Sequence, residues 1–320
     1  MTPVYGYPGH VLLALVPLGA LPLGPAAFIW GAAGIAFAIL GVRALLHAYV
    51  PALPVIHTLA GFTLIASQPA VLTLHNGQWG FLLVGLISLS VLGLRGGHDL
   101  RAGGALALAA LAKPQLFLIS VPTLLRVALA RGRPRALLAF AGVAVALVAV
   151  SIAVMPRWPG EWVHVVTGRL PLRPQATAVP TAFADLFGPA GLALGALLIV
   201  ALAVAVVAFH PRSDAAIAVA LAVSAVVVPY AWSYDQLLLV VPLVIAAGLV
   251  ARRSPPRGVA LMCAGSVLLL LVGTLLHTLF GEARQSESYN AVVPALMALL
   301  IVVGLWPLRG HAGTGSPPPP

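Results

Sequence analysis

Charged residues and cysteine are both scarce in this sequence of 320 residues. Only 8% of the residues are Asp, Glu, Lys or Arg, against roughly 25% in a typical soluble domain, whereas 61% are apolar. This imbalance excludes an ordinary soluble domain. The single cysteine, Cys263, lies within an apolar run, which excludes a disulfide framework and a thiolate metal site. Because neither a metal-ligand spacing nor a nucleotide-binding glycine loop occurs, the sequence predicts no metal and no cofactor.

Acidic residues are few as well, and the formal net charge is +10. A nucleic-acid-binding protein gathers its basic residues on one face or in one tract. Here the basic residues stand singly or in short groups between apolar runs. This arrangement speaks against nucleic acid as a partner and is typical of the cytoplasmic loops of a multi-pass membrane protein.

The apolar residues gather in runs of the length that a membrane-spanning helix needs. The sequence therefore predicts an all-α fold, a polytopic transmembrane helical bundle of about nine crossings in contact with membrane lipid. We expect one domain over residues 1–309, followed by a disordered Gly/Pro tail at 310–320. The expected crossings are Pro25–Val42, Ala52–Leu74, Trp79–Leu94, Ala136–Met155, Phe187–Phe209, Ala215–Ala231, Asp235–Ala251, Gly258–Phe280 and Ala291–Leu308.

The arginines predict how the bundle is oriented in the cell (plasma) membrane, because positive charge favours cytoplasmic loops. One orientation leaves only Arg157, Arg169, Arg173 and Arg284 outside, together with most of the acids. The C-terminus is then cytoplasmic, and the long connection Pro156–Leu186 is extracytoplasmic. The remaining arginines face the cytoplasm: Arg43, Arg95, Arg101, Arg126, Arg131, Arg133, Arg135, Arg212, Arg252, Arg253, Arg257 and Arg309.

The segment Ala102–Leu125 does not fit as a simple crossing, because a crossing would place the arginines after it outside. We expect a re-entrant hairpin that enters from the cytoplasm and turns at Lys113-Pro114-Gln115. Pro114 lacks an N–H and disfavours helix at Lys113, so the break has a local cause. Non-helical backbone at membrane depth is tolerated where protein or a water-filled cavity surrounds it, and the hairpin therefore points into a cavity.

Lys113 is the only lysine in the chain. An ionisable residue at membrane depth is costly and is a functional candidate by default. The alternative is a lysine whose ammonium reaches the interface along its own methylenes. Its place in the middle of an apolar run favours function, and a phosphate is the natural partner of such a compact cation.

Two outward turns supply the other candidate residues. His75, Asn76 and Gln78 precede Trp79 in the first turn, and their donors and acceptors suit sugar hydroxyls. As an outer loop, this turn would be polar without any function. The second turn carries Trp232, Tyr234 and Asp235. Asp235 either caps the helix that it begins or acts at the rim of the cavity as a general base.

Several motifs in a fixed order resemble glycosyltransferase family 87. They are Tyr5-Gly6-Tyr7-Pro8, Leu18-Gly19-Ala20-Leu21-Pro22, Gly77-Gln78, Ala112-Lys113-Pro114-Gln115-Leu116 and Pro229-Tyr230-Ala231-Trp232-Ser233-Tyr234-Asp235-Gln236. The resemblance implies a GT-C-type membrane enzyme whose donor is a sugar, of hexosyl or mannosyl type, linked to polyprenyl phosphate. The acceptor would be a lipid or a glycan on the extracytoplasmic face. On the matching motifs, substrate contacts would come from Gln78, Lys113, Gln115, Trp232 and Tyr234.

The N-terminal region departs from the family pattern. The family usually has an N-terminal helix and then an outer loop that carries a catalytic Asp, whereas Met1–Arg43 holds no acidic residue. Either His10–Leu23 crosses the membrane despite its short length, or an upstream helix is missing. The resemblance implies a chain that alone transfers sugar weakly or not at all, and the catalytic Asp of the family cannot be carried over to any residue here. Asp235 is the candidate for a catalytic carboxylate because, of the acids expected outside, it alone begins a crossing within a matching motif. The alternatives to an enzyme are a non-catalytic transporter or flippase and an inactive, truncated paralogue.

Overall fold

A computed structural model describes residues 8–50, 52–169, 179–228, 231–281 and 288–310. No strand occurs within these ranges, so the all-α prediction is confirmed. The predicted tail at 310–320 lies outside them except for Gly310, and so do most of the first family motif and the acids Glu282 and Glu287.

The described helices follow the predicted apolar runs closely. The first half of the chain forms α1 (Gly9–Gly19), α2 (Leu23–Tyr49), α3 (Pro54–Ala66), α4 (Gln68–His75), α5 (Gly80–Gly96), α6 (Asp99–Ala112), η1 (Pro114–Phe117), α7 (Ser120–Ala130), α8 (Pro134–Val154) and α9 (Trp158–Arg169). The second half forms α10 (Val179–Phe187), α11 (Pro189–Ala208), α12 (Asp214–Val227), η2 (Ser233–Leu239), α13 (Val240–Ala251), α14 (Pro255–Val267), η3 (Leu268–Val272), α15 (Gly273–Leu276), η4 (His277–Gly281), η5 (Ser288–Ala291), α17 (Val292–Leu305) and η6 (Trp306–Leu308).

Within the described ranges, seven helical stretches are long and apolar enough to cross a membrane: Leu23–Tyr49, Pro54–His75, Pro134–Val154, Pro189–Ala208, Ser233–Ala251, Pro255–Phe280 and Tyr289–Leu308. Two further expected crossings form the shorter apolar helices α5 and α12, so the count of nine crossings stays a prediction. Large apolar side chains on α8, such as Leu138 and Val145, are exposed. A surface of exposed apolar side chains is more stable in contact with lipid than in contact with water.

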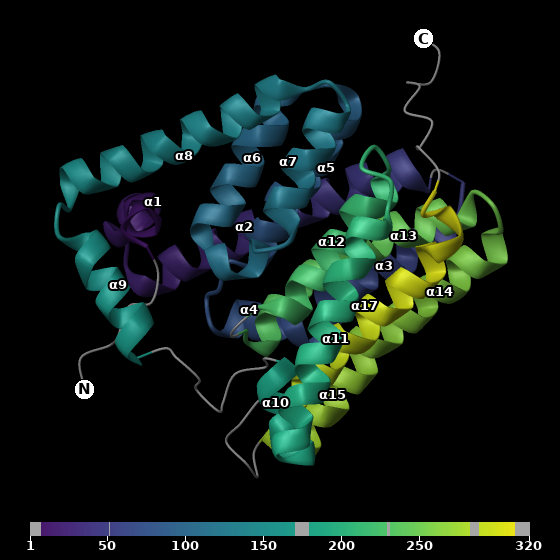
Figure 1. Ribbon diagram of the computed structural model, residues 1–320. Coiled ribbons are helices and arrows are strands. Elements are labelled where there is room, and N and C mark those ends of the chain that lie inside the picture. Colours follow the sequence, from purple (N-terminus) through teal and green to yellow (C-terminus); the bar gives the residue numbers. More distant parts are fainter. Residues whose placement is uncertain (1–7, 51, 170–178, 229–230, 282–287, 311–320) are drawn as a thin grey trace.

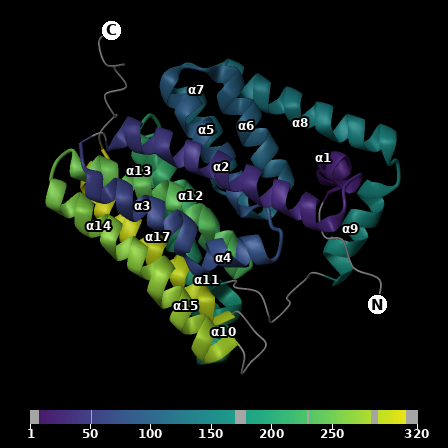
Figure 2. The same cartoon turned by 180° about the vertical axis from the view of Figure 1, so that it is seen from behind.

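Two groups of helices meet along α12 and α13, whose residues are almost all buried. One group, on one side of α12 and α13, consists of α5, α6, α7 and α8. The other group, on the opposite side, consists of α3, α11, α14 and α17 (Figure 1). From behind, α2 runs across α5 (Figure 2), and these two helices pack directly on each other. The short 3₁₀ helices η1 and η2 lie at the junction between the two groups.

The chain turns back at Lys113, where the sequence analysis placed the turn of a hairpin. Helix α6 leads into this turn and α7 leads away from it (Figure 1), and an Arg133–Asp99 contact of 3.5 Å links the start of α6 to the segment that follows α7. At the tip, the N–H groups of Ile119 and Ser120 donate to Ser224 Oγ of α12, at 3.3 and 2.8 Å. These bonds satisfy backbone groups that the break at Pro114 leaves without helical partners.

A cluster of ion pairs links α5, α7 and α12 at the end of the bundle where these helices meet. Asp214 accepts from Arg95 at 2.6 Å and from Arg131 at 2.7 Å, with 12% of its side chain exposed. The Arg131 guanidinium also donates to the carbonyl of Arg212. Several arginines expected on the cytoplasmic side are therefore brought together at one end of the molecule.

We expect Asp214→Asn to lower the free energy of unfolding by about 2 kcal/mol, because it removes a charged acceptor from two partly buried arginines. Asp99→Asn is the matched control, and its longer, more exposed pair with Arg133 predicts a loss below about 1 kcal/mol. Thermal unfolding of both variants in one detergent measures the difference. Equal losses in the two variants would contradict this ranking.

Candidate functional site

Lys113 and Asp235 form a buried ion pair at the junction of the two helix groups. Lys113 Nζ lies 2.6 Å from Asp235 Oδ1, and each side chain is 3% exposed. Lys113 sits at the tip of the α6–α7 hairpin, and Asp235 lies in η2, 122 residues further along the chain. Burying two charges costs several kcal/mol per ion unless they are paired and hydrogen-bonded. Each residue therefore makes the other's burial possible.

The backbone around η2 holds the Asp235 carboxylate in place. Trp232 is extended, with φ −114° and ψ 159°, and its N–H donates to Asp235 Oδ2 at 3.1 Å. In return, the Asp235 N–H donates to the carbonyl of Trp232 at 2.9 Å. This reciprocal arrangement caps the start of η2, so the capping role considered from the sequence is present together with the ion pair. Asp235 Oδ2 accepts the hydrogen bond of the cap, and Asp235 Oδ1 accepts from the Lys113 ammonium.

Two further side chains surround the Lys113 ammonium. Its Nζ lies 3.4 Å from Gln78 Oε1 and 4.5 Å from the centroid of the Tyr234 ring. The ring face attracts the cation, and the amide oxygen accepts a hydrogen bond. The Thr73 hydroxyl lies 3.3 Å from the carbonyl oxygen of Tyr234 and so links α4 to η2. The hairpin tip, the α4–α5 turn and η2 thus converge on one lysine.

The structure brings some of the predicted residues together and leaves others apart. Gln78, Lys113, Tyr234 and Asp235 form one cluster, which Trp232 joins through its backbone N–H. The remaining three predicted residues have no described contact with Lys113. His75 and Asn76 are exposed in the α4–α5 turn, and Gln115 is half-buried in η1.

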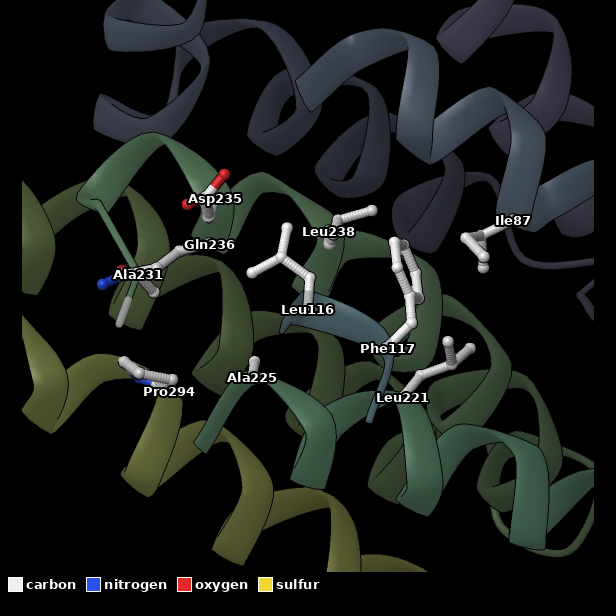
Figure 3. Close-up of a pocket in the computed structure, with 10 residues that line it drawn as sticks. All are labelled: Ile87, Leu116, Phe117, Leu221, Ala225, Ala231, Asp235, Gln236, Leu238 and Pro294. Atoms are coloured by element: carbon white, nitrogen blue, oxygen red, sulfur yellow. The ribbon is translucent and has the colours of Figure 1, made fainter. Parts of the chain in front are cut away.

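Asp235 also lines a narrow pocket with a cavity volume of about 20 Å³. Its walls are mostly apolar, and they include Leu116 and Phe117 from the hairpin tip (Figure 3). Asp235 and Gln236 are its polar residues. Asp235 thus belongs both to the ion pair with Lys113 and to the lining of this pocket.

The sequence analysis missed Gln236 and its neighbour Asn290. Gln236 is 3% exposed, and its Nε2 donates to the carbonyl of Asn290 at 3.0 Å. Because a carbonyl accepts only from the N–H₂ end of the amide, this bond fixes Gln236 Oε1 as the remaining atom. That oxygen is buried, and no group of the residues that the structure describes donates to it, which is costly unless a hydroxyl or water does so. In the sequence, the indication that Gln236 belongs to the site was its position directly after Asp235.

A second, larger groove is lined by α2 and by Gln78, with a volume of about 370 Å³. Its walls come from α2, from the end of α4 and from the start of α5, and they include Trp30, His75 and Phe81. The Trp30 ring packs edge-on against Trp79, and its Nε1 donates to the carbonyl of Gly77 at 3.1 Å. Two residues that contact Lys113 therefore line cavities: Gln78 lines this groove and Asp235 lines the smaller pocket.

This arrangement combines a cation that can hold an anion, a carboxylate that can hold a proton and amide groups that can bind hydroxyls. No group of three or more His, Cys, Asp and Glu side chains suited to a metal ion occurs in the described ranges. The chemistry available from these side chains is acid–base and electrostatic.

Comparison with known proteins gives the class of reaction. The family model of glycosyltransferase family 87 matches residues 5–242, which include the hairpin, the α4–α5 turn and the Lys113–Asp235 pair. Neither the curated proteins nor the solved structures contain a match to the chain. The matched residues make up well over half of the sequence, and the chain therefore belongs to glycosyltransferase family 87, a family of membrane-embedded sugar-transferring enzymes in which its many apolar helices fit.

Proposed function

We propose that this glycosyltransferase takes its sugar from a polyprenyl-phosphate donor and passes it to a lipid or glycan acceptor at the Lys113–Asp235 site. The proposed active face is extracytoplasmic, and the proposed location is the plasma membrane, with the C-terminus in the cytoplasm. The observation that carries the proposal is the burial of the chain's only lysine at the tip of a helix hairpin, against a carboxylate and next to an apolar groove.

Lys113 is proposed to bind the donor phosphate. An ammonium is a compact point charge that suits a phosphate oxygen. At membrane depth, an anionic headgroup offsets the free-energy cost of burying the ammonium. Without donor, Asp235 Oδ1 is the counter-ion of the ammonium. An arriving phosphate competes for the same N–H donors, so binding of the donor separates the carboxylate from its cation.

Asp235 is then proposed to act as the general base. Its freed carboxylate takes the proton from the acceptor hydroxyl as the hydroxyl oxygen attacks the anomeric carbon of the donor sugar. The bond between that carbon and the phosphate oxygen breaks, and polyprenyl phosphate leaves with the electron pair. Lys113 stabilises the negative charge of the leaving phosphate. The ion pair in this way links arrival of the donor to availability of the base.

The amide side chains are proposed to position hydroxyl groups. Gln78 is next to the ammonium and is suited to a hydroxyl of the donor sugar. Gln236 lines the pocket that Asp235 also lines, and its Oε1 is suited to a hydroxyl that enters there. Asn76 and His75 lie further out, in the exposed α4–α5 turn, where a larger acceptor would pass.

Transfer of labelled sugar tests the proposal. Membranes that contain the chain receive polyprenyl-phosphate mannose, glucose or galactose labelled in the sugar, and label in membrane lipid and glycan is counted. We expect weak but measurable incorporation from one of the donors and none in Lys113→Gln, with the exposed Arg101→Gln on the same hairpin as the control. Donor that binds but never yields transferred sugar would instead indicate the second candidate, a carrier of lipid-linked sugar.

Reporter fusions test the proposed sidedness. We expect a reporter placed after Arg309 to behave as cytoplasmic and one inserted near Gly168, within the long predicted outer connection, to behave as extracytoplasmic. The physical reason is the excess of arginine on the predicted cytoplasmic side. An inverted result at either position would place the Lys113–Asp235 site on the wrong face for this proposal.

A further inference from the structure

We infer that the groove along α2 holds the hydrocarbon chain of the lipid phosphate, so that this groove sets the chain length that the protein prefers. The inference rests on the proposed function, because it assigns a place to the tail of the proposed donor. It concerns residues of α2, such as Ala27, Trp30 and Gly31, to which the family resemblance assigns no role.

The groove has the shape and lining of a site for a single chain. It offers about 370 Å³ of space between α2, α4 and α5, and its walls are predominantly apolar. Gly31 and Gly34 lie on the wall that α2 supplies. A Cβ at Gly34 would lie 3.4 Å from Phe81 Cβ, whereas a Cβ at Gly31 would have only Leu74 Cδ2 within 4 Å, at 3.5 Å. The absence of a side chain at Gly31 therefore keeps the groove open.

One end of the groove is polar, and this end is directed to the cation. Gln78 lines the groove, and its Oε1 also contacts Lys113 Nζ at 3.4 Å. The indole N–H of Trp30 is already bonded to the Gly77 carbonyl, so Trp30 has no unsatisfied donor to offer a polar ligand. An amphiphile with an apolar chain and a single anionic head satisfies both ends at once.

The groove is also accessible from the bilayer. Leu23 is one of its lining residues and is 85% exposed, and Phe28 on the same helix is 76% exposed. A chain already dissolved in lipid enters sideways without crossing water. Because lipid tails are as apolar as leucine, the hydrophobic effect adds little. Affinity then comes from van der Waals packing along the groove and from the fixed position of the head next to Lys113.

Filling the groove tests the inference. Gly31→Leu places an isobutyl group in the groove, and Ala32→Leu adds a side chain of the same size at an exposed position of α2 that does not line the groove. Binding of radiolabelled undecaprenyl phosphate and of geranyl phosphate is measured on the purified chain in detergent. We expect Gly31→Leu to bind the long lipid about tenfold more weakly, which corresponds to about 1.4 kcal/mol, and to bind the short lipid as the unsubstituted chain does. Ala32→Leu should bind both as the unsubstituted chain does.

Several results would overturn the inference. Unchanged binding of undecaprenyl phosphate by Gly31→Leu would show that the groove contacts ordinary bilayer lipid. An equal loss for both lipids would show a general defect in head binding. If Gly31→Leu does not fold, Ala27→Leu on the same wall replaces it, because Ala27 is exposed and tolerates added atoms. If the unsubstituted chain binds neither lipid, the inference fails together with the proposed donor, whereas sugar transfer with no dependence on chain length contradicts the inference alone.

Discussion

Lys113→Gln should abolish binding of a lipid phosphate and also weaken the fold. The variant removes the ammonium at similar side-chain length and leaves the Asp235 carboxylate buried without its cation. Removal of one partner of a buried pair typically costs about 3–5 kcal/mol. Thermal unfolding in detergent and binding of undecaprenyl phosphate are measured on the same preparation.

The double variant Lys113→Gln/Asp235→Asn separates the two effects of Lys113. With both charges gone, no buried ion lacks its partner, and stability should return to within about 1 kcal/mol of the unsubstituted chain, as it often does when a buried pair is replaced by neutral groups. Lipid-phosphate binding should stay lost, because the cation is still absent. If the double variant regains binding, Lys113 acts only as a structural partner of Asp235.

Asp235→Asn should lower the rate of sugar transfer without weakening binding of the donor, whereas Lys113→Gln should abolish that binding. The amide oxygen introduced by this substitution can still accept the Trp232 N–H, so the cap of η2 is retained, but the amide cannot take a proton from an acceptor hydroxyl. Loss of general-base help predicts a fall in kcat of about 10²–10⁴. The KM for the donor should not rise, because the carboxylate that competes with the donor phosphate for Lys113 has gone.

Asp214→Asn is the matched control for Asp235→Asn. It also removes an ion-paired carboxylate, but this carboxylate lies at the end of the bundle, where its partners are Arg95 and Arg131. Activity per folded molecule should therefore be unchanged in this variant. A fall in kcat of the same size in Asp214→Asn would mean that loss of stability, not loss of a base, explains the effect at Asp235.

The sequence could predict the features that depend on neighbouring residues. The break at Lys113-Pro114 follows from the missing N–H of proline, and the structure turns there. The helix break at Ser67, between α3 and α4, was not predicted, although Pro69 follows it closely. Helix bounds follow the apolar runs because lipid demands that backbone hydrogen bonds be satisfied within each helix.

Features that depend on contacts across the chain could not be predicted. The sequence analysis placed Lys113 at the turn of a hairpin that points into a cavity and Asp235 at the rim of that cavity, as separate candidates, whereas the structure pairs them at 2.6 Å. No local rule brings together two residues that lie 122 positions apart. Gln236 and Asn290 were missed for the same reason, since only the packing of η2 near η5 leaves the Gln236 oxygen buried without a donor among the described residues.

The central claim is that the buried lysine holds a lipid phosphate, and the chain's single lysine makes a direct measurement possible. A protein labelled with ¹⁵N at the lysine side chain gives an Nζ signal that can come only from Lys113. We expect this signal to shift on titration with undecaprenyl phosphate and to stay in place with undecaprenol, which has the same chain and no phosphate. An Nζ signal that does not move at saturating undecaprenyl phosphate, or that moves equally with undecaprenol, would contradict the claim.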